Sequence, residues 1–219
     1  MGERVKRPGR VEGGGAASVG VAEHGNSAVL VTLGSAGRFL DRRRVDLTRD
    51  LPTHPYHHEG SWAVGRYLNS SWAKTISLPD AVALVARVRE AAARGARESL
   101  AALAATVTVP IGRIAIRVCP PLPPTTEERI ADTRAANVAD SVMYREALAT
   151  AAEAHGWSVH WYDRDSVFRD AAARLGGQDI DTFLQAMGRS IGPPWQAKHK
   201  LAAAAALAAA QSISSSPSE

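Results

Sequence analysis

The segment at residues 54–59 contains the side chains best suited to chemistry. Four groups that bind metals or transfer protons fall within it, namely His54, His57, His58 and Glu59. Imidazole and carboxylate are common zinc ligands, and both also act as general acids and bases. The spacing differs from the helical motif that carries two histidines, so a divalent metal would need a further ligand such as His160 or His199. Three interpretations stay open: a catalytic or substrate-contact loop, a metal site, or a polar loop whose histidines bond to the backbone.

Cys119 is a second candidate for catalysis. It follows an apolar run at residues 111–118 and precedes a proline-rich loop that leads into a helix. The carboxyl end of a strand is where an α/β sheet usually presents its site. A cysteine there becomes a nucleophile when a base or a positive environment lowers its pKa. The alternative interpretation is a small buried hydrophobe, the commoner role of a free cysteine.

Two groups of basic residues could bind phosphate. Arg42 and Arg44 lie in a predicted strand, where alternation places them on one face. Trp195, Lys198 and Lys200 lie at the start of the last predicted helix. An aromatic ring beside cations can stack a nucleobase while the cations hold a phosphate. The alternative is that these cations are solvated and that Trp195 anchors the helix.

The elements that must position these groups indicate a mixed α/β fold. Apolar, β-branched runs separated by turn residues predict strands at residues 28–33, 38–47, 111–118 and 157–162. A short helix at 61–68 and a brief strand at 72–76 are also expected. Longer helices are predicted at 78–105 with a break near Gly95, at 125–154 as one helix or as two separated by a break, and at 165–175, 180–191 and 196–210. An opening hairpin followed by helix-linked strands predicts a mixed sheet, antiparallel then parallel, with helices on both faces.

Composition predicts one folded domain with two tails. The chain has 219 residues, 45% of them hydrophobic, and a net charge of +4 that can attract polyanions. Residues 1–24 are basic and glycine-rich and residues 211–219 are serine-rich, so both are expected to be disordered around a domain at 25–210. No apolar stretch is long enough for a membrane span. One cysteine excludes an intramolecular disulfide, and we expect a soluble, cytoplasmic, bacterial protein.

Several of these segments follow one another in a familiar order. They are the hairpin at 29–35 and 38–47, the strand at 114–118, the strand at 157–162 and the helix that follows Pro194. In this order the chain resembles the ribonuclease H-like superfamily, particularly its Holliday-junction-resolvase-like branch, over residues 26–210. The resemblance implies a ribonuclease H-like fold and an association with nucleic acid.

The same resemblance raises a question about metal-dependent cleavage. Active members of this superfamily hold two divalent metals with acids in the first strand, near the end of the fourth strand and on the last helix. The residues at the corresponding positions here are Thr32 and Leu33, then Arg117 and Cys119, then His199 and Lys200. In a two-metal site, carboxylates neutralise the charge of the divalent metals. Arg117 and Lys200 carry positive charge and would repel the metals instead. The resemblance therefore implies that the usual two-metal site is absent.

These observations favour a nucleic-acid-associated, ribonuclease H-like domain that lacks the usual nuclease site. One alternative is a hydrolase centred on residues 54–59, which we call the histidine-rich loop. Another is a module that binds a protein partner of unknown identity. No phosphate-binding P-loop, dinucleotide fingerprint or nucleophile elbow is present. The sequence leaves open whether the protein is an enzyme and which cofactor, if any, it binds.

Overall fold

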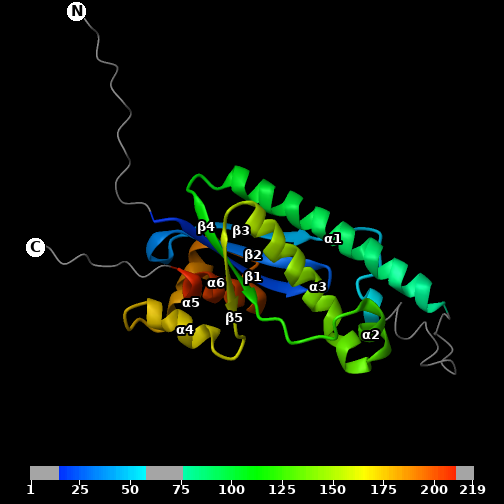
Figure 1. Ribbon diagram of the computed structural model, residues 1–219. Coiled ribbons are helices and arrows are strands. Elements are labelled where there is room, and N and C mark those ends of the chain that lie inside the picture. The colour runs from blue at the N-terminus through cyan, green and yellow to red at the C-terminus, as the bar shows by residue number, and fades with distance from the viewer. Residues whose placement is uncertain (1–14, 58–75, 211–219) are drawn as a thin grey trace, which may run out of the picture.

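A five-stranded mixed sheet forms the centre of the protein in the computed structural model, which describes residues 15–57 and 76–210 (Figure 1). Its strands lie in the order β3-β2-β1-β4-β5. Neighbours β1, β2 and β3 are antiparallel, whereas β1, β4 and β5 are parallel. The bounds are β1 (Ala17–His24), β2 (Ser27–Leu33), β3 (Phe39–Asp46), β4 (Ile111–Arg117) and β5 (Ser158–Tyr162). This arrangement confirms the predicted mixed sheet with an antiparallel hairpin and parallel strands.

The central strand β1 lies where the sequence predicted a disordered tail. The assignment of residues 1–24 to a tail is therefore wrong for Ala17–His24. The strand directs Val19 and Val21 toward one core and smaller residues, including Gly20, toward the other. A Cβ atom on Gly20 would lie 1.8 Å from the carbonyl oxygen of Ala202, so close helix packing requires glycine there. Small residues lower the local hydrophobicity, and that made a buried strand look like a tail.

Helices cover both faces of the sheet (Figure 1). One face carries α1 (Leu78–Thr106), α2 (Thr126–Ala131) and α3 (Thr133–Ala154), and the other carries α4 (Val167–Arg174), α5 (Ile180–Ile191) and α6 (Ala197–Ala209). A 3-10 turn, η1 (Ser35–Gly37), joins β2 to β3. Within residues 15–57 and 76–210, no helix combines the length and apolar character that crossing a membrane requires.

Helix α1 is continuous through Gly95, so the predicted break there is wrong. The side chain of Ser77 caps its first turn as expected. A Cβ atom on Gly95 would lie 2.2 Å from the carbonyl oxygen of Leu47. The glycine therefore permits close contact between α1 and the chain after β3. The helix expected at 61–68 and nearly all of the strand expected at 72–76 lie outside the described residues.

Helix α6 is positioned by close packing on the sheet and by a contact at its carboxyl end. Its alanines are buried against the sheet, which lets the helix lie close to β1 and β2. At its carboxyl end, Arg113 Nη1 on β4 donates a 2.7 Å hydrogen bond to the carbonyl oxygen of Ala209. A cation at this end also complements the negative pole of the helix. The amino end of α6 is thereby held at the carboxyl ends of the parallel strands.

Candidate nucleic-acid interface

Three adjoining cavities form a groove at the carboxyl ends of β1, β4 and β5. The central cavity of about 410 Å³ lies between the end of β1, the end of β4 and the amino-terminal turns of α4 and α6. It shares Arg117 and Arg164 with a second cavity of about 420 Å³. It shares Ala22, His24 and Lys198 with a third cavity of about 380 Å³. We call these three connected cavities the cationic groove. The carboxyl edge of parallel strands is where α/β proteins commonly bind ligands.

Three cations of the groove have no ion-pair partner among the described residues. They are Arg117 at the end of β4, Arg164 in the turn after β5 and Lys198 in the first turn of α6. Burial lowers the pKa of Lys198; Arg44 lowers it further, while Glu23 acts in the opposite direction. Glu23 supplies part of the counter-charge, and Asp163 and Asp165 line the second cavity, but none of these acids forms an ion pair with the three cations. An anionic ligand would therefore add favourable charge interactions. The groove therefore suits a polyanion.

Glu23 is the carboxylate that lines the central cavity, and it forms an ion pair with Arg145. Arg145 on α3 donates from Nε to Glu23 Oε1 at 2.8 Å and from Nη1 to the carbonyl oxygen of Val118 at 2.8 Å. Both side chains of the ion pair are less than a tenth exposed. The pair therefore ties α3 to the ends of β1 and β4. The sequence interpretation missed Glu23 because it took β2 for the first strand, and so the inferred absence of an acid from the first strand is wrong.

Arg42 and Trp195 position the groove and do not line it. Arg42 Nη1 on β3 donates to the carbonyl oxygens of Gly192, at 3.0 Å, and Pro194, so its guanidinium holds the turn before α6. Trp195 Nε1 donates to the carbonyl oxygen of Leu184 at 2.9 Å. Its indole ring packs on Gly188, where a Cβ atom would lie 2.2 Å from the ring. The Arg42 guanidinium and the Trp195 indole N–H are therefore bonded to backbone carbonyl oxygens and do not face a ligand in the groove.

The other predicted phosphate ligands divide between the groove and its surroundings. Arg44 and Lys198 both line the third cavity, together with His24 and His199. Arg44 is exposed and makes a long ion pair of 3.4 Å with Asp46. Lys200 does not line any of the three cavities. It follows Lys198 by two positions on α6, and such residues lie on different sides of a helix.

Cys119 lines the second cavity, but its surroundings do not favour a thiolate. Burial raises the pKa of its thiol above the usual value, and nearby Arg145 offsets only part of that effect. A nucleophilic cysteine needs the opposite shift. The described lining of this cavity includes Ser141 and no residue of the 54–57 segment. Cys119 and His57 therefore do not converge on this cavity.

The histidine-rich loop packs on another side of α3. His58 and Glu59 lie outside the described residues. Asp140 Oδ1 accepts a 3.0 Å hydrogen bond from the backbone amide of Tyr56, and its Oδ2 lies 3.6 Å from His54 Nδ1. Burial raises the pKa of Asp140 to about 7, although backbone amides of Tyr56 and His57 oppose the shift. This arrangement anchors the loop to α3.

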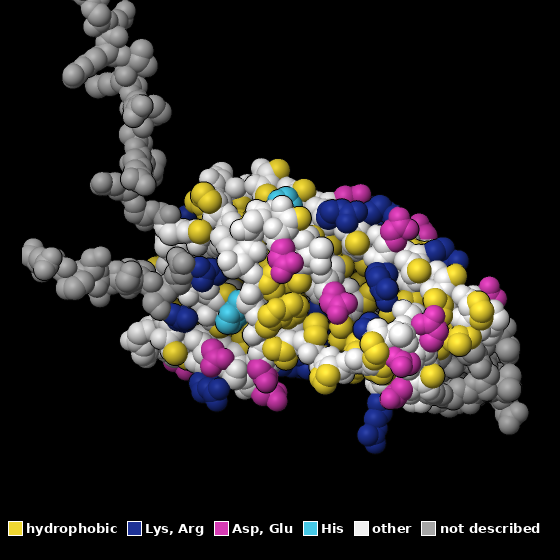
Figure 2. All heavy atoms as spheres, viewed as in Figure 1, with side chains coloured by type: hydrophobic (Ala, Val, Ile, Leu, Met, Phe, Trp, Pro, Cys, Tyr) yellow, Lys and Arg dark blue, Asp and Glu magenta, His cyan; other side chains and the backbone are white. Residues whose placement is uncertain are grey.

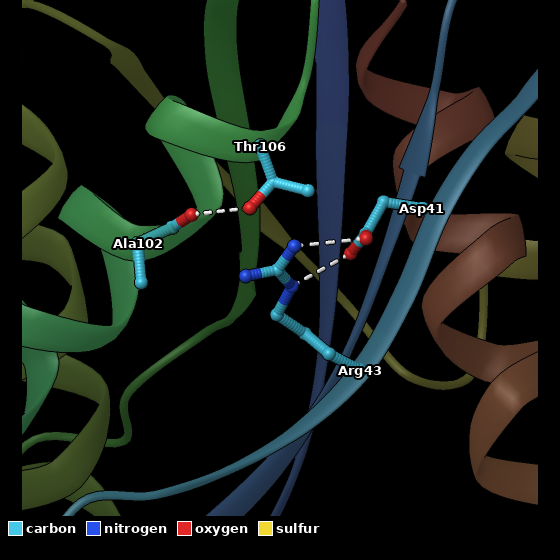
Figure 3. Close-up of polar contacts among 4 residues, drawn as sticks. All are labelled: Asp41, Arg43, Ala102 and Thr106. Carbon is cyan, nitrogen blue, oxygen red and sulfur yellow. Dashed lines mark hydrogen bonds and ion pairs between the residues drawn. The ribbon is translucent and has the colours of Figure 1, made fainter.

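A larger cavity of about 850 Å³ lies between β3 and α1, and its basic residues are largely paired. Figure 3 shows Arg43 beside the end of α1, with Nε and Nη2 donating to the carboxylate of Asp41 at 2.7 and 2.8 Å. Arg94 Nη1 likewise lies 2.8 Å from Glu90 Oε1. Three of the five arginines that line this cavity, Arg43, Arg44 and Arg94, thus form ion pairs, whereas Arg117, Arg164 and Lys198 of the cationic groove form none among the described residues.

Comparison with known proteins yields a likeness in structure and none in sequence. No protein-family model and no curated protein sequence matches the chain. The fold is similar to that of RuvC from T. thermophilus, solved in complex with a Holliday junction substrate. The two share 14% identity over 88% of this chain and 91% of that one, with a TM-score of 0.45. The likeness concerns the course of the chain alone, so function has to be inferred from the geometry of the groove.

The residues of the groove do not fit a two-metal site. Among the described residues, histidine, cysteine and acidic side chains do not gather in a group able to hold a metal ion. The central cavity combines one paired carboxylate, Glu23, with Arg117, Arg164 and Lys198. These cations would repel divalent metals.

Besides Glu23, sequence reasoning missed three other polar or aromatic residues that line the central cavity: His24, Arg164 and Phe168. A simple rule would have found Arg164, because it lies two residues after a strand whose carboxyl end faces the site.

Proposed function

We propose that this protein binds nucleic acid along the cationic groove and does not cut it by two-metal chemistry. One observation carries the proposal: Arg117, Arg164 and Lys198 converge on one cavity without ion-pair partners among the described residues. Phosphate groups would supply the missing counter-charge, and phosphate contacts contribute much of the affinity of nucleic-acid-binding proteins. The bacterial cytoplasm expected from composition stays part of this proposal.

The extent of the groove favours a polymer over a single phosphate. Arg44 and His24 continue the lining on one side of the central cavity, and the second cavity, on the other side, combines Arg117 and Arg164 with Asp163 and Asp165. The amino end of α6 adds the positive pole of a helix of 13 residues. A nucleic-acid backbone presents a row of charges that can occupy such a connected groove.

Fluorescence anisotropy with labelled oligonucleotides tests the proposal. We expect wild-type protein to bind at about 50 mM salt and Lys198→Ala to weaken binding by about fivefold or more. Arg87→Ala is the control. Arg87 is an exposed arginine on α1, which covers the face of the sheet opposite to α6 and Lys198, and it lines none of the three cavities. Absence of binding at low salt, or equal losses for both variants, would contradict the proposal.

A further inference from the structure

Large hydrophobic side chains gather around the cationic groove. Five such residues are exposed in the described part of the chain, and four of them lie at or beside the groove. Phe168, 36% exposed, lines the central cavity, while Val118 and Val138, 40% and 36% exposed, line the second. Trp161 is 43% exposed on β5. Figure 2 shows hydrophobic side chains gathered over the region of β5 and α3.

Trp161 belongs to the same surface as the valines. The register pairs it with Ile116 on β4, and Val118 comes directly after the end of that strand, where its backbone amide still donates to the carbonyl oxygen of Tyr162. Side chains two residues apart on a strand point to the same face of a sheet. Trp161 therefore lies diagonally across from Val118, on the face covered by α3.

A ligand that is both anionic and apolar would contact the three cations and the exposed hydrophobic side chains together. A duplex presents its phosphates but hides the flat faces of its bases. An unpaired strand exposes both, and aromatic side chains stack on its bases. Phe168 shares one cavity with Arg117 and Lys198, which is the combination that such a strand requires.

We propose that the cationic groove selects unpaired nucleotides. The phosphates lie along Arg117, Arg164 and Lys198, one base stacks on Phe168, and a neighbouring base enters the second cavity between Val118 and Val138. This inference rests on the proposed function and adds the class of nucleic acid. Charge favours this occupant over an apolar protein surface, which would leave the three cations buried without counter-charge.

Three probes of about 15 nucleotides test the inference on the full chain: an oligo-dT strand, a duplex of the same length and a strand of the same length with abasic sites. We expect the oligo-dT strand to bind at least about tenfold more tightly than either of the others at equal salt. The abasic strand keeps the phosphates and lacks the bases, so this comparison isolates stacking without any substitution in the protein.

Variants then locate the contact. Phe168→Ala should weaken binding of the oligo-dT strand by about tenfold and leave the abasic strand unaffected, whereas Lys198→Ala should weaken both. Phe168→Trp should retain binding. Val138→Ser tests the second cavity independently, and Leu78→Ala is the control, because Leu78 is exposed at the start of α1.

The outcomes separate the two proposals. Equal affinity for the oligo-dT and abasic strands, or tighter binding of the duplex, would overturn the inference while leaving the proposed function intact. Equal affinity for the oligo-dT and abasic strands would indicate that the exposed apolar residues contact a protein partner and not nucleobases. Failure to bind any of the three probes would overturn the proposed function as well.

Discussion

The buried carboxyl of Asp140 should make the stability of the protein fall as pH rises. Asp140 is a residue of α3 that accepts a hydrogen bond from the histidine-rich loop and is only 3% exposed. Burial raises its pKa from 3.8 to about 7, because desolvation disfavours the charged form. In the unfolded chain the same carboxyl ionises near its ordinary value. Between the two values the folded state therefore holds one more proton than the unfolded state.

The sign and size of the effect come from that difference. A group whose pKa is raised by folding contributes its full stability below the unfolded value and loses it as pH rises through the folded value. The interval from 3.8 to about 7 corresponds to about 4 kcal/mol at most. His54 Nδ1 lies 3.6 Å from Asp140 Oδ2, and a proton on that nitrogen would offset part of this loss. We expect the free energy of unfolding to fall by about 2–4 kcal/mol between about pH 4 and about pH 8.

Urea unfolding of Asp140→Asn measures the effect directly. The amide can still accept the Tyr56 hydrogen bond but cannot ionise. The variant should be more stable than wild type by about 2–4 kcal/mol at about pH 8, and similar to wild type at about pH 4. Glu146→Gln, an exposed carboxyl on the same helix, is the control and should change little at either pH. A wild-type stability that stays constant or rises over this interval would refute the reasoning.

Three further substitutions test the packing around the groove. Gly20→Ala should lower the free energy of unfolding by roughly 3 kcal/mol, because its Cβ would meet the Ala202 carbonyl; an unchanged melting temperature would contradict that close approach. Glu23→Gln should cost about 3–5 kcal/mol in chemical unfolding, since it leaves Arg145 buried without its counter-charge; a loss below about 1 kcal/mol would mean that water reaches the pair. Arg42→Ala should weaken oligonucleotide binding without changing its salt dependence, because Arg42 holds a turn and touches no phosphate; a shallower salt dependence would make it a direct contact.

The periodic elements could be predicted from the sequence, and the central strand could not. Helix α5 begins and ends where its capping and apolar pattern predicted, at Ile180 and Ile191. β1 was not predicted because Gly20 and its small neighbours give the strand a low local hydrophobicity. These small residues are required by the close contact with α6, which depends on tertiary structure and cannot be read from the local sequence. The same requirement explains Gly95, where contact with Leu47 overrides the low helix propensity of glycine.

The candidate site could be predicted only in part for a related reason. Basic residues in strands and helix starts indicated phosphate binding, and Arg44 and Lys198 do line the groove. Composition could not distinguish Arg42, whose guanidinium is held by backbone carbonyls, from a free cation. Phe168 was missed because its exposure depends on how α4 packs beside the end of the sheet, which no local pattern reveals.

The salt dependence of oligonucleotide binding tests the central claim most directly. The logarithm of the association constant falls linearly with the logarithm of salt concentration, by about 0.7 for each phosphate contact to a single strand. A variant with Arg117, Arg164 and Lys198 all replaced by alanine should therefore show a slope shallower than wild type by about 2. A triple variant that binds with the wild-type slope would show that these three cations do not meet the phosphate backbone.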